Sequence, residues 1–259
     1  RFIPSLPGYV YAVKDNQVYV NLYLSNKAEL IVNKKKVVLE QETGYPWNGD
    51  IRVKVAQGNQ EFALKLRIPG WVRDEVLPSD LYSYADNQKP TYRIIVNGQE
   101  TANTLNNGYL SIERKWKKGD VVKIHFDMLP RIVKANEKVV DDKGRVSVER
   151  GPIVYCAEWP DNKCNVHTVL LNQHPQFKVV EKPELLYGIS QLKTDAQALS
   201  YDKNGKLITK DTELTLIPYY AWAHRGEGDM EVWLPIDVSA ASALPQEVQK
   251  WEDNGFFKN

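Results

Sequence analysis

The sequence predicts an all-β protein built from two jelly-roll or β-sandwich modules. Short apolar runs alternate with polar or charged residues at period two, as in half-buried strands. Turn residues such as Asn-Gly and Pro-Gly separate these runs at spacings typical of hairpins and sandwiches. Residues 147–158 (SVERGPIVYCAE) join two apolar runs across Gly151 and Pro152, a pair that interrupts a strand. This stretch therefore indicates the seam between the two modules.

The first half of the chain holds the clearer strands. In residues 51–55 and 62–68, apolar side chains alternate with Arg and Lys, so one face of each strand is expected to meet water. Residues 71–90 break the alternation and predict a long connection. The predicted strands are, in order, 9–13, 18–24, 28–32, 36–41, 51–55, 62–68, 92–96, 109–112 and 121–126.

The second half has a weaker pattern, with predicted strands at 146–149, 153–157, 166–171, 177–180, 207–208, 214–217 and 230–234. The last two, rich in large apolar residues, suggest that the chain returns to the larger core. We therefore expect a first sandwich of residues 1–127 plus 214–236, with a second, smaller sandwich, 128–213, inserted into it. Residues 237–259 are expected to be a tail with one short helix at 245–251.

Composition excludes several classes of partner. The 259 residues carry a net charge of +1, which gives no reason to expect nucleic acid or an anionic membrane. No apolar run approaches the ~20 residues that span a bilayer. The sequence starts at Arg1-Phe2-Ile3 without an initiator Met or a signal peptide, so we expect a fragment of a longer protein.

No catalytic or metal-binding constellation stands out. Glycosidases use two carboxylates that flank one bond, but no acidic pair has a spacing that singles it out. Glu149 and Glu158 flank the seam and are expected to be surface or ion-paired residues. No His-x-His or His-x-x-x-His spacing occurs among the four histidines, which are His125, His167, His174 and His224. We therefore expect no catalytic, metal or cofactor residue in this chain.

The two cysteines leave two alternatives open. Cys156 and Cys164 flank a short polar segment, and on adjacent strands they would be within reach of a disulfide. Cys156 could equally be a small buried apolar residue without a disulfide partner.

Aromatic residues in loops are the candidate contact residues. Tyr45, Trp47 and Trp71 lie in predicted connections, where they could stack on sugars or pack against a neighbouring domain. The alternative is that these rings plug the end of a sandwich core. With the apolar lead-in 2–4, they are the expected members of an exposed interface.

Seven short motifs together resemble the C-terminal part of glycoside hydrolase family 127, the β-L-arabinofuranosidase family. They cover about residues 1–236 and are GYPWNG at 44–49, LRIPGW at 66–71, VNG at 96–98, GYL at 108–110, WKKGD at 116–120, ERGP at 149–152 and IPYYAW at 217–222.

The resemblance implies a parent enzyme with an N-terminal (α/α)6 barrel followed by two jelly rolls. The family's nucleophile is a zinc-bound cysteine in a Cys-Cys-Pro-x-Asn run, which in relatives comes just before the segment that corresponds to Arg1. Neither Cys156 nor Cys164 matches that run, so no catalytic role carries over to this chain, and zinc is expected only in the missing barrel.

We therefore expect the non-catalytic β-sandwich region of a bacterial glycoside hydrolase, periplasmic or secreted. It would support the catalytic barrel and could mediate homodimerisation. The alternative function is a carbohydrate-binding module for plant glycans, with Tyr45, Trp47 and Trp71 as contacts.

Overall fold

The computed structural model describes residues 2–101 and 104–241. The regular secondary structure of the described residues is almost entirely β-strand, with only a few short helical turns, which confirms the all-β prediction. It divides into two compact units. The first unit comprises Arg1–Pro78 and Gln88–Leu129, and the second comprises Ser79–Asn87 and Pro130–Asn259.

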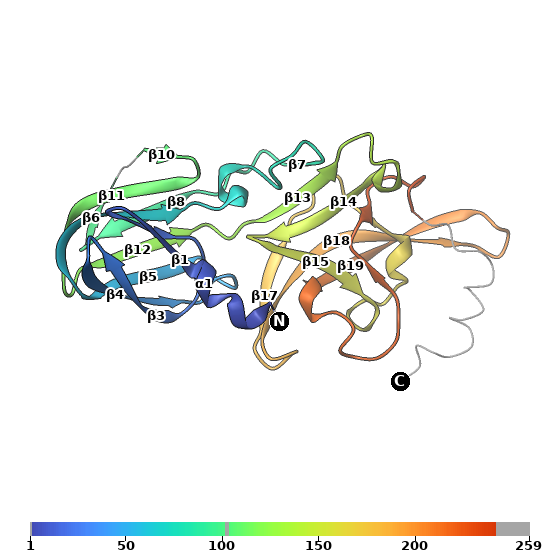
Figure 1. Ribbon diagram of the computed structural model, residues 1–259. Coiled ribbons are helices and arrows are strands. Elements are labelled where there is room, and N and C mark those ends of the chain that lie inside the picture. The colour runs from blue at the N-terminus through green and yellow to red at the C-terminus, as the bar shows by residue number, and fades with distance from the viewer. Residues whose placement is uncertain (1, 102–103, 242–259) are drawn as a thin grey trace. The chain divides into compact units, whose positions relative to one another are not determined.

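The first unit consists of two sheets (Figure 1). The order of strands in the five-stranded sheet is β1 (Tyr11–Lys14), β2 (Gln17–Val20), β6 (Asn59–Arg67), β11 (Tyr109–Lys117) and β10 (Leu105–Asn106). In the six-stranded sheet the order is β3 (Asn26–Val32), β4 (Lys35–Thr43), β5 (Asp50–Gln57), β12 (Val121–Phe126), β8 (Tyr92–Val96) and β9 (Gln99–Glu100). Helices η1 (Ile3–Ser5) and α1 (Pro7–Val10) precede the strands, and η2 (Gly70–Arg73) follows β6.

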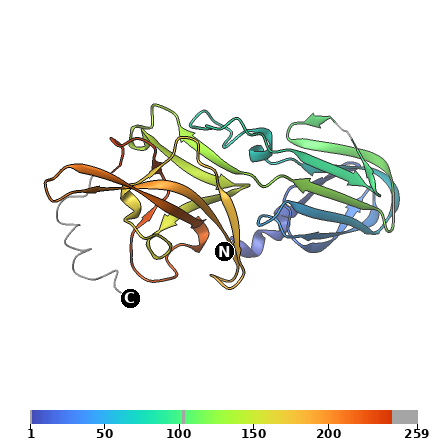
Figure 2. The ribbon, with the colours of Figure 1, turned by 180° about the vertical axis from the view of Figure 1, so that it is seen from behind.

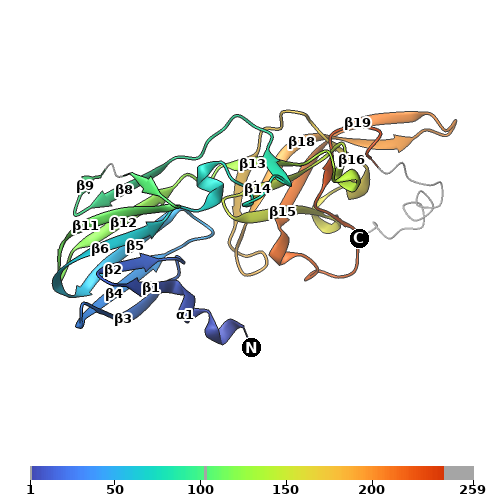
Figure 3. The ribbon, with the colours of Figure 1, turned by 45° about the horizontal axis from the view of Figure 1, so that its top comes forward.

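Alternation along these strands explains the core of the first unit. In β5 the side chains of Ile51, Val53 and Val55 are buried, whereas Arg52 and Lys54 lie on the opposite, wetter face. Trp116 of β11 is fully buried and donates its indole N–H to the Phe62 carbonyl at 3.0 Å. Figure 3 shows β12 beside β5 and β8 in the six-stranded sheet.

The second unit is organised around one large, mostly antiparallel sheet. Its main path runs β16 (Val169–Leu171), β18 (Ile189–Tyr201), β19 (Leu207–Pro218), β15 (Ile153–Glu158), β14 (Arg145–Arg150), β13 (Pro130–Ala135) and β7 (Tyr82–Tyr84). Three further strands branch from it, namely β17 (Lys178–Lys182), β20 (Met230–Glu231) and β21 (Leu234–Pro235). The remaining helical turns are η3 (Val140–Asp142), η4 (Trp159–Asp161), η5 (Val166–Thr168) and η6 (Tyr219–Ala221). From behind, the β18–β19 hairpin extends past the other strands of this unit (Figure 2).

Opposite faces of β15 carry two separate apolar clusters. Tyr155 and Ala157 belong to the larger cluster, whereas Cys156 packs with Ile189 and Ile217 in a smaller one. Because side chains alternate between the faces of a strand, neighbours in sequence enter different clusters. Both clusters consist of residues of the second unit alone.

The predicted domain boundaries are wrong in one respect. Residues 214–217 belong to β19, which pairs with β18 and β15, and residues 230–235 supply β20 and β21, which pair with β15 and β14. These strands therefore complete the second unit and do not rejoin the first sandwich. The apolar pattern of 214–217 indicated a buried strand, but burial alone does not identify the pairing partner.

A short segment makes the opposite excursion. The predicted connection 71–90 contains η2 and the strand β7, and β7 pairs with β13 in the second unit. Residues 79–87 thus join the second unit although residues on both sides belong to the first. The predicted helix at 245–251 lies outside the described residues. No helix in the described ranges is long and apolar enough to cross a bilayer.

Candidate functional site

The three candidate aromatic residues lie in different environments. Trp71 is only 7% exposed, packs edge-on against Phe126, and donates its indole N–H to the Tyr45 hydroxyl at 3.2 Å. Tyr45 is half-buried against Tyr23 and Phe126. Only Trp47 is mainly accessible, at 52%. Trp71 therefore belongs to the core, and the expectation that it lies in an exposed interface is wrong. Tyr45 packs beside it and is only partly accessible.

Hydrogen bonds within the loop 44–50 fix its conformation. The Trp47 backbone N–H donates to the Gly44 carbonyl at 2.9 Å, and the Asp50 N–H donates to the Asn48 side-chain oxygen at 3.0 Å. The Thr43 hydroxyl donates to the Asp50 carbonyl at 2.8 Å, which joins the two ends of the loop. The loop is therefore a built turn that holds Trp47 at its tip.

A surface groove of about 550 Å³ lies beside this loop. Its floor is the solvent face of β4, β5, β12 and β8, and Gly44, Asn48 and Asp50 of the loop form one edge. Half of its twelve lining residues have acidic, basic or imidazole side chains, and these are Glu42, Asp50, Arg52, Arg93, Lys123 and His125. We refer to these six residues as the sheet groove.

Strand register brings the sheet-groove residues together. Arg52 lies opposite Glu42 on one side and Lys123 on the other, and its guanidinium is 3.0 Å from the Glu42 carboxylate. In the adjacent row His125 lies opposite Asp50 and Arg93. The His125 ring nitrogen Nδ1 is 2.7 Å from the Asp50 carboxylate. The groove therefore presents hydrogen-bond donors and acceptors side by side.

The carboxylate of Asp127 lies near the second ring nitrogen of His125. It lies 3.5 Å from His125 Nε2 and accepts the Thr91 backbone N–H at 3.1 Å. Hydrogen bonds from Thr91 lower the pKa of Asp127, so this carboxylate stays ionised.

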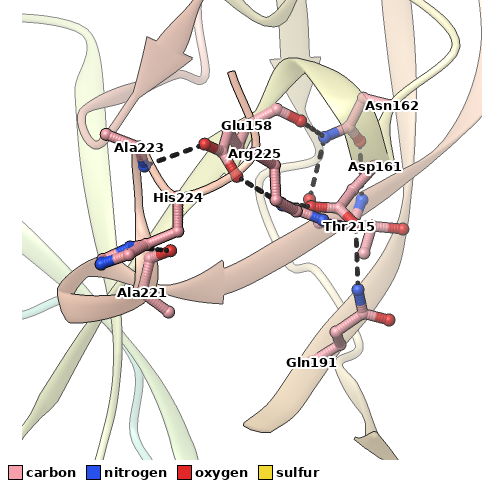
Figure 4. A network of polar contacts seen from close by, with 9 residues as sticks. All are labelled: Glu158, Asp161, Asn162, Gln191, Thr215, Ala221, Ala223, His224 and Arg225. Atoms are coloured by element: carbon pink, nitrogen blue, oxygen red, sulfur yellow. Dashed lines mark hydrogen bonds and ion pairs between the residues drawn. The ribbon is translucent and has the colours of Figure 1, made fainter. Parts of the chain in front are cut away.

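A buried polar network occupies the second unit (Figure 4). Arg225 forms close ion pairs with both Glu158 and Asp161, and its pKa is raised by these carboxylates. Glu158 is 1% exposed and also accepts the Ala223 backbone N–H at 3.0 Å. Asp161 accepts the Gln191 side-chain amide at 3.1 Å. Glu158 is thus ion-paired, as one predicted alternative held, but it does not lie on the surface.

Asn162 extends this network into the sheet. Its side-chain amide donates to the Glu158 and Thr215 carbonyls at 2.9 and 3.0 Å, and its oxygen accepts the Thr215 N–H at 2.9 Å. These contacts join the segment after β15, the loop 219–229 and the sheet to one another. The network therefore has the features of a structural anchor, because its charges pair with one another inside the protein.

Two further titratable groups have perturbed acidity. His167 lies 2.6 Å from the Glu231 carboxylate and 3.7 Å from that of Asp229, and hydrogen bonding to Glu231 raises its pKa. Burial raises the pKa of Glu149, which accepts a hydrogen bond from the Tyr84 hydroxyl at 3.3 Å. Each group is engaged by protein partners within the second unit.

Cys156 and Cys164 do not form a disulfide with each other. Cys156 lies in the smaller apolar cluster and Cys164 packs against the larger one, so their side chains occupy opposite faces of the sheet. Burial raises the pKa of the Cys156 thiol to about 12, which suppresses the thiolate form needed for nucleophilic attack or metal binding. Of the two alternatives, Cys156 as a small buried apolar residue is correct.

The described residues contain no group of three or more His, Cys, Asp or Glu side chains placed to hold a metal ion. The zinc implied by the family resemblance therefore has no fitting ligand set in residues 2–101 and 104–241, and no step of chemistry can be assigned to it here.

Exposed aromatic residues gather on and next to η6. Tyr219 and Trp222 stack with ring centroids 5.9 Å apart and planes inclined by 12°. They and Tyr220 are 37–51% exposed. We call Tyr219, Tyr220 and Trp222 the aromatic surface. The predicted interface omitted these residues, although their motif had been singled out for its resemblance.

Comparison with known proteins assigns both halves of the chain. Residues 17–128 match the family model described as Beta-L-arabinofuranosidase, GH127 middle domain. Residues 130–235 match the model described as Glycoside hydrolase family 127 C-terminal domain. The boundary between the two matches falls where the first unit ends and β13 begins.

Similar proteins are substantially longer than this chain. A solved structure described as a GH127 β-arabinofuranosidase is 80% identical with a TM-score of 0.92, covering 95% of this chain and 39% of its own. The structure of a GH127 β-L-arabinofuranosidase from Geobacillus stearothermophilus T6 is 31% identical with a TM-score of 0.78. The match covers 90% of this chain and 36% of that protein's chain. A non-reducing end β-L-arabinofuranosidase from Bifidobacterium longum subsp. longum is 28% identical, and the match covers 90% of this chain and 35% of that protein. The chain thus spans little more than a third of these relatives.

Proposed function

The chain belongs to glycoside hydrolase family 127, and from this premise we propose that it is the non-catalytic β-region of a β-L-arabinofuranosidase. The observation that carries the proposal is the pair of consecutive matches to the family's middle and C-terminal domains. Relatives named for that activity extend well beyond the matched stretch. We infer that a barrel in the remainder of the enzyme supplies the nucleophile, the acid/base and the zinc.

The chemistry of the described residues supports this division of labour. A retaining glycosidase needs a nucleophile and a proton donor on opposite sides of one bond. Glu158 is buried in an ion pair, and Glu149 accepts a hydrogen bond from a tyrosine inside the second unit. The Cys156 thiol is buried and protonated at neutral pH. None of these groups is poised to attack a sugar.

The proposed role of the second unit is to hold a catalytic domain through its aromatic surface. Stacked, partly exposed rings on a short helical turn lose water favourably when another surface covers them. The Glu158–Arg225–Asp161 network anchors the loop that follows these rings. A second copy of this chain on the same surface is the competing arrangement, and solution mass measurement distinguishes the two.

Turnover by the isolated chain tests the proposal. We expect residues 1–259 to leave an aryl β-L-arabinofuranoside unhydrolysed, with or without added zinc. Hydrolysis that disappears in Asp50→Asn or Glu149→Gln would locate a catalytic group within this chain and overturn the proposal.

A further inference from the structure

The sheet groove has the dimensions and chemistry of a ligand site that the proposed function leaves unused. Its volume of about 550 Å³ lies within the range of ligand pockets, about 300–1,000 Å³. Four neighbouring strands and one hydrogen-bonded loop form it, so its polar groups are held by regular structure. The inference below rests on the proposed function only for the choice of sugar.

Most charged groups in the groove are paired, but they remain accessible to a ligand. Glu42 is matched by Arg52 and Asp50 by His125, and both carboxylates remain mainly exposed, at 67% and 76%. Within the described part of the chain, Lys123 and Arg93 have no ion-pair partner, although the charge of Arg93 reaches Asp127. Carboxylate oxygens that can accept and cationic groups that can donate therefore lie within two adjacent rows of one sheet.

This pattern matches the hydroxyl groups of a sugar. A hydroxyl both donates and accepts, so neighbouring carboxylate and guanidinium or ammonium groups can bind it from both sides. An anionic ligand fits less well, because Glu42 and Asp50 lie in the same groove as the cations. The composition of the groove thus favours an uncharged, hydroxyl-rich ligand.

An exposed aromatic ring lies on the loop beside the groove. Trp47 is 52% exposed on the loop whose neighbouring residues Gly44, Asn48 and Asp50 line the groove. Gly49 is buried below the loop, where an added Cβ would lie 1.9 Å from the Phe126 carbonyl oxygen. The ring is therefore carried on a rigid loop edge, and the apolar face of a sugar can stack on such a ring.

We propose that the sheet groove binds a neutral glycan chain, with Arg93 and Lys123 donating to sugar hydroxyls and Trp47 stacking on a sugar ring. Given the family, the glycan contains L-arabinofuranose. The site would hold the polysaccharide near a catalytic domain without taking part in the chemistry. It differs from the predicted aromatic site, because Trp71 is buried and Tyr45 is half-buried against Tyr23 and Phe126.

Binding of purified arabinan to the chain, measured by calorimetry and affinity electrophoresis, tests the site. We expect Arg93→Ala with Lys123→Ala to weaken binding at least about tenfold, since hydrogen bonds from charged groups are lost. Trp47→Ala should weaken it about five- to tenfold through lost stacking. Lys54→Ala is the matched control, because Lys54 lies on the same face of β5 but outside the groove, and it should bind as the unaltered chain does.

Three outcomes would overturn the inference. Equal binding by the groove variants and the unaltered chain would place any glycan contact elsewhere. Absence of arabinan binding would remove the site. Binding of polygalacturonate in place of arabinan, weakening steeply with salt, would show an anion site. Because none of these measurements uses turnover, failure of the groove is distinguishable from failure of the non-catalytic proposal.

Discussion

At the scale of single residues, the second unit shows how a buried charge can be tolerated. Glu158 is 1% exposed, yet Arg225 and the Ala223 N–H satisfy its oxygens. Removing the guanidinium would leave a buried carboxylate without its cation. The resulting loss of folding free energy is larger than the net stabilisation that the intact ion pair provides.

We expect Arg225→Met to lower the free energy of unfolding of the second unit by about 3–5 kcal/mol in urea titrations. Adding Glu158→Gln should recover part of this loss, because the orphaned charge is removed. Lys193→Met, which breaks the more exposed pair with Glu213, is the control and should cost less than about 1 kcal/mol. A loss of similar size in both single variants would contradict the anchoring role of Arg225.

His167 gives the second unit a defined pH dependence. Its pKa is raised by Glu231, so the protonated form is favoured in the folded state. The resulting stabilisation is complete below the unfolded pKa of about 6.5 and is lost as the pH rises through the higher folded value. Arg145 also contacts the Glu231 carboxylate, at 2.9 Å, so the histidine and the arginine share one partner.

The difference in unfolding free energy between the unaltered chain and His167→Gln should therefore be larger at pH 6 than at pH 9. Denaturant titrations across this range measure it. His174→Gln, at an exposed loop histidine, is the matched control and should leave the pH profile unchanged. A difference that stays constant or grows with rising pH would show that the ion pair with Glu231 is not formed in the folded protein.

At the scale of elements, close backbone approach fixes the loop 44–50. Gly49 lies against the Phe126 backbone. The backbone N–H of Phe126 donates a hydrogen bond to the Gly49 carbonyl at 3.0 Å. No side chain fits on the Phe126 side of the loop. The position of Trp47 and of one groove edge therefore depends on a glycine.

Gly49→Ala should destabilise the first unit by roughly 2 kcal/mol or more, because the added methyl overlaps a carbonyl oxygen and the backbone must move. Gly8→Ala is a suitable control, since nothing lies within 4 Å of a Cβ at that position. Thermal unfolding of the two variants gives the comparison. Equal melting temperatures would contradict the close packing of the loop on β12.

Some elements were predictable from sequence and others were not. The strands β5, β6 and β12 follow directly from period-two alternation. The longest strand, β18, was not predicted because it buries Ser190, Gln191 and Thr194 among its apolar residues. Ser190 and Gln191 are satisfied by Glu181 and Asp161, which lie 9 and 30 residues away, so the alternation within the strand could not indicate that they are buried.

The groove illustrates the same limit for functional residues. Arg52 and Lys54 were recognised as the wet face of one strand, but the alignment of Arg52 with Glu42 and Lys123 depends on register between strands. Register is set by long-range pairing and is not encoded in one strand's alternation. Trp71 was placed in a loop correctly, yet its burial depends on Phe126 and Tyr45, which lie in other elements.

At the scale of the whole molecule, neither unit is a single continuous stretch of the chain. Residues 79–87 interrupt the first unit in sequence, and Asp86 pairs there with the buried Arg131 at 3.0 Å. The predicted insertion had the opposite sense, with a late segment returning to the first sandwich. Both arrangements bury similar strands, so composition could not distinguish them.

The most direct test of a supporting role is complementation in trans. The part of the 80%-identical relative that lies outside the matched stretch would be produced alone and assayed on an aryl β-L-arabinofuranoside, with and without residues 1–259. We predict that adding this chain raises the rate towards that of the intact relative. A chain carrying Tyr219→Ser and Trp222→Ser should fail to do so, whereas Ile31→Ser, at an exposed site in the first unit, should succeed. Full activity of the relative's part alone, unchanged by this chain, would contradict the supporting role.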